Sequence, residues 1–234
     1  MNKYWKHKAK IVFGIGIPLG ILILIIQETF HIPKNVMLHG YIIGSIVVIF
    51  LAFVINCIWQ FRFQRRLKKM QTMLYQENEL DHYIIQTDEL LKKVKSNLNR
   101  NQLIINLSVA YCEKKQYEKA KEILLTIDEN TLSGICKVIF YHDLAYYYFM
   151  LDERQEALQI IQKHQKMFAK FEAHPSLGPC IKINYIYKFI YEENWAKAKE
   201  LLLELRDIQQ DEMLKRSFQL AKQRFEQLTQ KPIS

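Results

Sequence analysis

The sequence has few of the residues that interrupt helices or crosslink chains. Among its 234 residues are only 7 glycines, 5 prolines and 4 cysteines, and no low-complexity tract occurs. Scarce glycine and proline favour long, ordered helices. The cysteines are far apart, form no C-x-x-C pair and lie within apolar helical patterns: Cys57, Cys112, Cys136 and Cys180. We therefore expect reduced thiols that pack as small apolar groups, with no disulfide framework and no metal site.

Sequence motifs that carry catalysis are also missing. The chain has no H-E-x-x-H, no phosphate-binding glycine loop and no G-x-S-x-G. Its 7 histidines are scattered, and the adjacent His142 and Asp143 are not expected to share one helix face. Acidic pairs such as Glu192-Glu193 fall at predicted turns or helix starts, where solvent and helix dipoles favour them. We predict that the protein is not an enzyme and holds no cofactor.

The net charge of +9 is unevenly distributed along the chain. Residues 1–35 contain five basic and one acidic residue, residues 36–100 nine and five, and residues 101–234 nineteen and eighteen. The basic excess therefore flanks the apolar N-terminal segments, where anionic lipid headgroups would lie. A nucleic-acid partner would need that excess on the distal domain, so we expect none.

Two apolar segments predict a helical membrane hairpin. Residues 11–26 are uncharged, and residues 36–59 contain a second uncharged span. Sixteen helical residues reach about 24 Å, short of the roughly 30 Å hydrocarbon core, and snorkelling of flanking polar side chains makes up the difference. We predict membrane helices at about 11–28 and 37–60, joined by a short external turn that contains Pro33. The alternative is a signal peptide, but no small-x-small cleavage site follows.

Basic residues lie at both outer ends of this hairpin and are nearly absent from its turn. By the positive-inside rule, the basic N-terminus 1–10 and the chain after residue 61 are cytoplasmic, and the protein crosses the cell membrane twice. The flanking basic residues are Lys3, Lys6, Lys8, Lys10, Arg62, Arg65, Arg66, Lys68 and Lys69. A juxtamembrane helix is expected over 62–79, with a bend or turn at residues 77–79, where the apolar pattern is interrupted.

Each apolar segment contains two glycines four residues apart, Gly16 with Gly20 and Gly40 with Gly44. This spacing lets helix backbones approach closely. The pairs could form a homodimer interface, or they could pack the two helices of one hairpin on each other, and both interpretations stay open. No ionisable residue lies in mid-membrane, so we expect no ion or proton path.

A helix–turn–helix pattern occupies Ile104–Ile127. Its small residues, Ser108 and Ala120, would let two antiparallel helices cross closely, and the polar segment 114–116 supplies a short turn. The same offsets recur at residues 141–161, where Asp152 is expected to cap the second helix. A weaker copy at residues 185–202 has Ile186 in place of the small residue. The matched positions of successive copies, Thr87, Ala120, Ala157 and Ala198, are 33, 37 and 41 residues apart.

This pattern resembles the tetratricopeptide repeat, whose units place small, aromatic and large apolar residues at these offsets about every 34 residues. The resemblance covers roughly residues 80–207, with uneven spacing and without the proline that usually closes the second helix. It implies an all-α chain, in which the membrane hairpin is followed by an irregular helical-repeat domain at 80–234. An amphipathic helix at 211–227 would cap the stack. A composition rich in Lys, Ile, Tyr and Asn suits an AT-rich bacterium.

The resemblance also implies a concave face lined by the first helix of each unit. Its exposed row would consist of Ile105, Val109, Cys112, His142, Tyr146, Phe149, Ile183, Tyr187 and Tyr191, with Asn106 and Asn184 as the nearest polar residues. This apolar, aromatic row lacks the Lys, Arg and Asn set with which clamp-type members of the family hold an acidic C-terminus. It suits an amphipathic helix or apolar peptide. Alternatively, the chain's own helices, including the last one, fill the row as core.

These features together predict a non-catalytic, membrane-tethered scaffold that binds an unidentified protein or peptide. Tethering would raise the local concentration of that partner at the bilayer. The alternative is a structural or accessory subunit that pairs with an integral membrane complex through the hairpin.

Overall fold

The computed structural model describes residues 20–21, 25, 27–29, 33–74, 79–206 and 212–230. These residues form helices, turns and loops without a strand, which confirms the predicted all-α class for this part of the chain. The chain divides into two compact units, Met1–Leu67 and Lys68–Ser234. The main elements are α3 (Lys34–Leu74), α4 (Leu80–Lys93), α5 (Asn97–Glu113), α6 (Tyr117–Leu124), the 3-10 helix η3 (Glu129–Thr131), α7 (Gly134–Met150), α8 (Arg154–Ala169), α9 (Leu177–Tyr191), α10 (Trp195–Leu205) and α11 (Glu212–Thr229).

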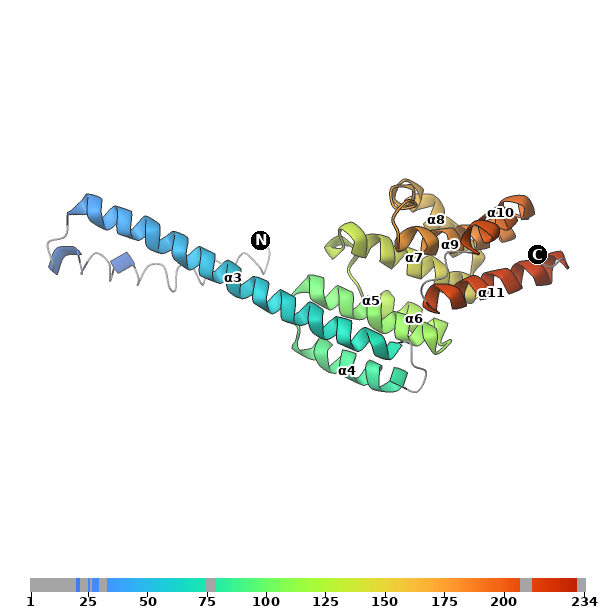
Figure 1. Cartoon of the computed structure of the whole chain (residues 1–234), viewed down its shortest axis with the longest axis horizontal. Coiled ribbons are helices and arrows are strands. Elements are labelled where there is room, and N and C mark those ends of the chain that lie inside the picture. Colours follow the sequence, from blue (N-terminus) through green and yellow to red (C-terminus); the bar gives the residue numbers. More distant parts are fainter. Residues whose placement is uncertain are drawn as a thin grey trace. The chain divides into compact units, whose positions relative to one another are not determined.

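Helix α3 is one unbroken helix of 41 residues (Figure 1). Its segment Val36–Phe61 carries no charge. At 1.5 Å per residue this segment extends about 39 Å, more than the roughly 30 Å of a hydrocarbon core. By length and composition, Leu38–Met70 is the one helix among the described residues that could cross a membrane, and its most apolar stretch is unburied.

The predicted membrane helix at 37–60 and the predicted juxtamembrane helix at 62–79 are continuous up to Leu74. No glycine or proline occurs from residue 45 to residue 79, so the basic cluster after residue 61 follows without a break. The interruption expected at 77–79 lies largely outside the described residues, because α3 is described up to Leu74 and the description resumes at Glu79, before α4. The first predicted membrane helix, at about 11–28, lies mostly outside the described residues.

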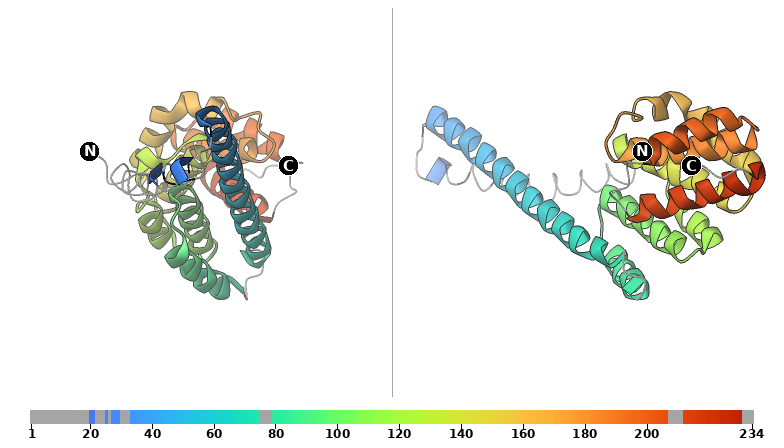
Figure 2. Two further views of the ribbon diagram at one scale, coloured as in Figure 1. Left: turned by 90° about the vertical axis from the view of Figure 1, so that its left-hand side faces the viewer. Right: turned by 45° about the vertical axis from the view of Figure 1, so that its right-hand side comes forward.

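Three antiparallel helical hairpins follow one another in the second unit: α5–α6, α7–α8 and α9–α10. Figure 2 shows these helices packed into one bundle, and the first helices contact in the order α5, α7, α9. Helix α4 packs against α5. A single core of buried side chains extends from Ile104 on α5 to Phe225 on α11. The three hairpins are therefore stacked side by side through their first helices.

The turns of the three hairpins have the same backbone geometry. Their second residues, Lys115, Asp152 and Glu193, have left-handed φ angles of 59°, 61° and 55°. In each turn the next amide donates to the carbonyl five residues earlier, over N···O distances of 2.9, 2.9 and 2.8 Å. This is the Schellman arrangement that ends a helix and reverses the chain. The predicted cap at Asp152 is therefore wrong, because Asp152 ends α7 and the residue that precedes α8 is Glu153.

The predicted crossing positions are the most buried places in each hairpin. Ser108, Ala145 and Ile186 lie seven residues before the left-handed residue, and Ala120, Ala157 and Ala198 lie five residues after it, all with no exposed surface. A small side chain on at least one helix of each pair lets the backbones approach closely. The third hairpin keeps Ala198 and accommodates the larger Ile186.

Helix α9 begins against the loop that precedes it, and this contact requires a glycine. A Cβ at Gly178 would lie 2.1 Å from the backbone oxygen of Glu172, far inside van der Waals contact. The chain therefore makes its turn from α8 into α9 at a point where no side chain fits.

The last helix, α11, packs against α9 and α10, as expected for a capping helix. It buries Phe218, Ala221 and Phe225, which recur along one face. Phe225 meets Trp195 of α10 edge to face, with ring centroids 6.1 Å apart. This helix decides how much of the concave row is accessible.

Candidate functional site

The aromatic members of the predicted concave row come together between α7 and α9. The ring of Phe149 stacks on Tyr187 and on Tyr191, with centroids 5.4 and 5.5 Å apart. Tyr146 meets Tyr187 edge to face at 6.1 Å. These rings come from two successive hairpins, so the sequence pattern identified side chains that contact one another across the stack.

The other predicted positions are distributed around this cluster. One small cavity is lined by Val109, Cys112, His142, Tyr146 and Ile183. Ile105 is instead buried in the core. Asn184 is buried as well. Most of the row is thus inaccessible to solvent.

Helix α11 is the element that covers the row. Ser217 hydrogen-bonds with the Tyr146 hydroxyl, and Met213 and Leu214 close the cavity that contains His142. That cavity encloses about 60 Å³. The chain's own last helix therefore covers part of the predicted row.

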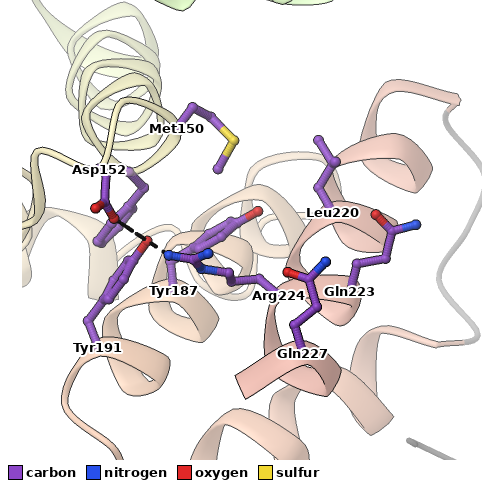
Figure 3. A pocket seen from close by; sticks show the side chains of 9 residues that line it. Met150, Asp152, Tyr187, Tyr191, Leu220, Gln223, Arg224 and Gln227 are labelled. Atoms are coloured by element: carbon purple, nitrogen blue, oxygen red, sulfur yellow. Dashed lines mark hydrogen bonds and ion pairs between the residues drawn. The ribbon is translucent and has the colours of Figure 1, made fainter. Parts of the chain in front are cut away.

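A second, larger cavity of about 420 Å³ opens beside α11 (Figure 3). Phe149, Tyr187 and Tyr191 form its aromatic wall, and Leu220 and Arg224 on α11 face them. The remaining lining residues are Met150, Asp152, Gln223 and Gln227. Helix α11 thus covers the row without filling it.

Two arginines tie α11 to the carboxyl ends of α5 and α7. The Arg216 guanidinium lies 2.6 Å from the carboxylate of Glu113, whose side chain is only 11% exposed. Arg224 lies 3.6 Å from Asp152 and 5.9 Å from the centre of the Tyr191 ring. Arg154 donates to both oxygens of Asp152, at 2.9 Å to Oδ1 and 3.3 Å to Oδ2, and this pairing lowers the pKa of the Asp152 carboxyl.

A cluster of polar side chains, His142, Asp143 and Asn184, lies at the small cavity and next to it. The Asn184 amide donates to the backbone oxygen of His142 at 2.9 Å, and its nitrogen lies 2.8 Å from His142 Nδ1. Burial lowers the pKa of His142 to about 4 and raises the pKa of Asp143 to about 8. Near neutral pH both side chains are therefore largely uncharged. Asp143 Oδ2 is buried without a hydrogen-bond partner.

The polar contacts of this region were missed by the sequence reasoning in two ways. Adjacency was taken to separate His142 from Asp143, yet His142 Nε2 lies 3.7 Å from Asp143 Oδ1. The ion pairs of Arg216 and Arg224 join residues about 70 to 100 positions apart, and nothing in a single sequence pairs them. Within the described ranges, no group of three or more His, Cys, Asp or Glu could hold a metal ion.

The membrane-related residues have less structural context. Gly20, Gly40 and Gly44 would each accept a Cβ without meeting any atom within 4 Å, whereas Gly16 lies outside the described residues. On α3 the five basic residues after Phe61 are exposed: Arg62, Arg65, Arg66, Lys68 and Lys69. Arg65 lies over the Phe61 ring, 4.5 Å from its centre. Lys3, Lys6, Lys8 and Lys10 are not among the residues that the structure describes.

Comparison with protein-family models, with curated proteins and with solved structures found no match to this chain. The functional interpretation therefore depends on the site itself.

Proposed function

We propose that this protein is a non-catalytic, membrane-tethered scaffold whose helical-repeat domain binds a protein or peptide. The observation that carries the proposal is the pairing of two features in one chain. Helix α3 has an unburied apolar span, and the second unit has a cavity of about 420 Å³ that is lined in part by the aromatic row. The first feature suits an anchor and the second suits a recognition surface.

The recurring hairpin geometry supports a tetratricopeptide-like domain. Three hairpins share a left-handed turn residue, a Schellman hydrogen bond and a buried alanine at the same offset. Stacks of such units form extended concave surfaces that bind other chains. The uneven spacing of 37 and 41 residues makes this a short and irregular version of that architecture.

A scaffold suits the chemistry of the row better than an enzyme does. Its described side chains are mostly aromatic or aliphatic, and the buried pair His142 and Asp143 is largely uncharged near neutral pH. Such groups supply apolar area and hydrogen bonds for recognition.

The proposed location is the cell membrane, with two spans and both ends in the cytoplasm. The exposed basic cluster after Phe61 supports a cytoplasmic position for the helical domain. Tags placed at each terminus test this topology, because both should be protected from protease in intact cells. A protease-accessible terminus would contradict it.

The binding function is tested by photo-crosslinking of the full-length chain in the cells that produce it. A photoreactive residue at Met150, which is partly exposed and borders the larger cavity from α7, should yield a specific adduct in the membrane fraction. The same residue at Gln159, exposed on α8, is the matched control and should not. Release of the chain by an alkaline wash, or identical products from both positions, would contradict the proposal.

The second candidate function is an accessory subunit of an integral membrane complex. It is favoured by the glycine pair of α3, because no atom of the described residues lies within 4 Å of a Cβ built on Gly40 or Gly44. A photoreactive residue at Tyr41, which is 56% exposed, would crosslink to another integral protein if α3 pairs in this way. Crosslinks confined to the chain itself would count against this candidate.

A further inference from the structure

Helix α11 uses only part of its apolar surface in its present position. Of its 18 residues, only Phe218, Ala221 and Phe225 are buried, whereas Leu228 is 48% exposed. The cavity of about 420 Å³ separates part of its inner face from Tyr187 and its neighbours (Figure 3). A helix that leaves such a space open is held less firmly than a fully packed core helix.

The surface that α11 covers, which we call the groove, combines an apolar floor that includes Phe149, Tyr187 and Tyr191 with an acidic edge. Glu113 is the last residue of α5, and Asp152 lies in the turn after α7. Helix C-termini carry partial negative charge, which adds to both carboxylates. Lys114, the nearest cation in sequence to Glu113, pairs instead with Asp81 of α4 at 2.5 Å.

The contacts of α11 show which kind of helix matches this groove. Phe218 and Phe225, seven residues apart, are buried on the inner face of α11 with the small Ala221 between them, and Phe225 packs on Trp195 of α10. Arg216 meets Glu113, and Arg224 lies 3.6 Å from Asp152, which also pairs with Arg154, so both arginines of α11 face the acidic edge. The carboxylate of Glu113 is largely buried, so its attraction for a cation is weakly screened by solvent.

We propose that the groove is the docking site for a cationic amphipathic helix of another protein, and that α11 occupies it until this partner binds. The partner helix carries two large apolar residues seven positions apart, a small residue between them, and arginine or lysine two positions before the first and one position before the second. This proposal rests on the proposed scaffold function and adds the chemistry of the partner. Competition between α11 and the partner makes the apparent affinity proportional to the fraction of chains with an open groove.

The test uses the full-length chain in detergent and a labelled peptide of residues 212–230 as the probe. Arg216→Glu removes the ion pair with Glu113 and places two carboxylates together, which should release α11. We expect the peptide to bind this variant about tenfold more tightly than the wild type, with faster amide exchange in α11. Lys215→Glu is the matched control, because this exposed neighbour pairs with Glu212 on the same helix, and it should behave like the wild type.

Two further reagents separate docking from general disruption. The milder Arg216→Gln should give an intermediate affinity, and it keeps the test usable if Arg216→Glu does not fold. A peptide with both Phe218→Ala and Phe225→Ala should not bind any chain. Exchange of the two charges, as Glu113→Arg with Arg216→Glu, should return amide exchange in α11 to the wild-type rate.

Several outcomes would overturn the proposal. Equal affinity of the peptide for wild type and Arg216→Glu, or unchanged exchange of α11 in that variant, would make α11 a permanent part of the core. Rapid α11 exchange without peptide binding would show that the open groove accepts no helix. Dimerisation of Arg216→Glu, measured by light scattering, would identify the occupant as α11 of a second copy. Peptide binding without any crosslinked partner in cells would instead contradict the scaffold function and leave the helix specificity of the groove intact.

Discussion

Asp143 is the buried group whose titration should control the pH dependence of stability. It lies on α7 beside His142, and its Oδ2 atom is buried without a hydrogen-bond partner. Burial raises the pKa of Tyr147 and the pKa of Cys112. The negative charge of Asp143 raises both pKa values further, and at Cys112 its effect is smaller than that of Glu113. Ionised Asp143 would therefore be an unsolvated charge among neutral groups, and folding favours its protonated form.

The sign of the effect follows from the pKa of Asp143 in each state. Burial raises this pKa to about 8 in the folded chain, whereas an unfolded aspartate titrates near pH 4. The folded state therefore holds a proton that the unfolded state has lost, so stability from this group falls as pH rises from about 4 to 8.

His142 acts in the opposite direction over part of this range. Burial lowers its pKa to about 4, below the value near 6.5 of an unfolded histidine, so its contribution raises stability from pH 4 to about 6.5. Each slope reaches about 1.4 kcal/mol per pH unit, so the two nearly cancel below pH 6.5. Between pH 6.5 and 8 only Asp143 contributes, and about 2 kcal/mol of unfolding free energy should be lost.

Urea unfolding of the full-length chain in detergent, followed by tryptophan fluorescence, measures this loss. Asp143→Asn should remove the fall between pH 6.5 and 8 and uncover the rise below pH 6.5 that His142 produces. Asp88→Asn, a partly exposed carboxyl on α4, is the control and should keep the wild-type profile. Parallel profiles of wild type and Asp143→Asn between pH 6.5 and 8 would refute the reasoning.

Four substitutions test the packing and the turns of the helical unit. Gly178→Ala should cost several kcal/mol of unfolding free energy, because its Cβ would lie 2.1 Å from a backbone oxygen, and a change below about 0.5 kcal/mol would show that the α8–α9 loop adapts. Phe225→Ala should lower the unfolding free energy by about 3 kcal/mol and abolish amide-exchange protection in α11 alone. Loss of protection throughout α5–α8 would contradict the prediction that α11 unfolds separately. Lys115→Gly should raise the unfolding free energy by about 1 kcal/mol, because its φ of 59° is costly for a residue with a Cβ. Gln159→Gly, in the exposed middle of α8, should lower it by a similar amount, and the same sign for both glycines would refute the turn argument.

The helical hairpins could be predicted from the sequence because their signals are local. Ser108 and Ala120 are small, the segment between them is polar, and the structure has its turn between Glu113 and Tyr117. The backbone of that turn was less predictable. Left-handed φ angles fall on Lys115, Asp152 and Glu193 rather than on glycine, so Asp152 was mistaken for a helix cap.

The candidate site was predicted in composition but not in accessibility. The rings of Phe149, Tyr187 and Tyr191 were expected to lie together, and they stack at 5.4 and 5.5 Å. Whether α11 covers them depends on where a helix more than 20 residues farther along the chain returns. Its apolar face could be predicted from the sequence pattern, but that pattern does not identify the surface against which the helix packs.

The helical class, the apolar span of α3 and the position of each hairpin turn could be predicted from local pattern, because each depends on residues within a few helical turns. The tertiary structure alone decided which groups meet across the stack. It placed Arg216 on Glu113, buried Asp143 without a partner for Oδ2, and seated α11 over the aromatic row. These contacts join residues far apart in the chain, and their energies depend on burial, which exists only once the helices have packed.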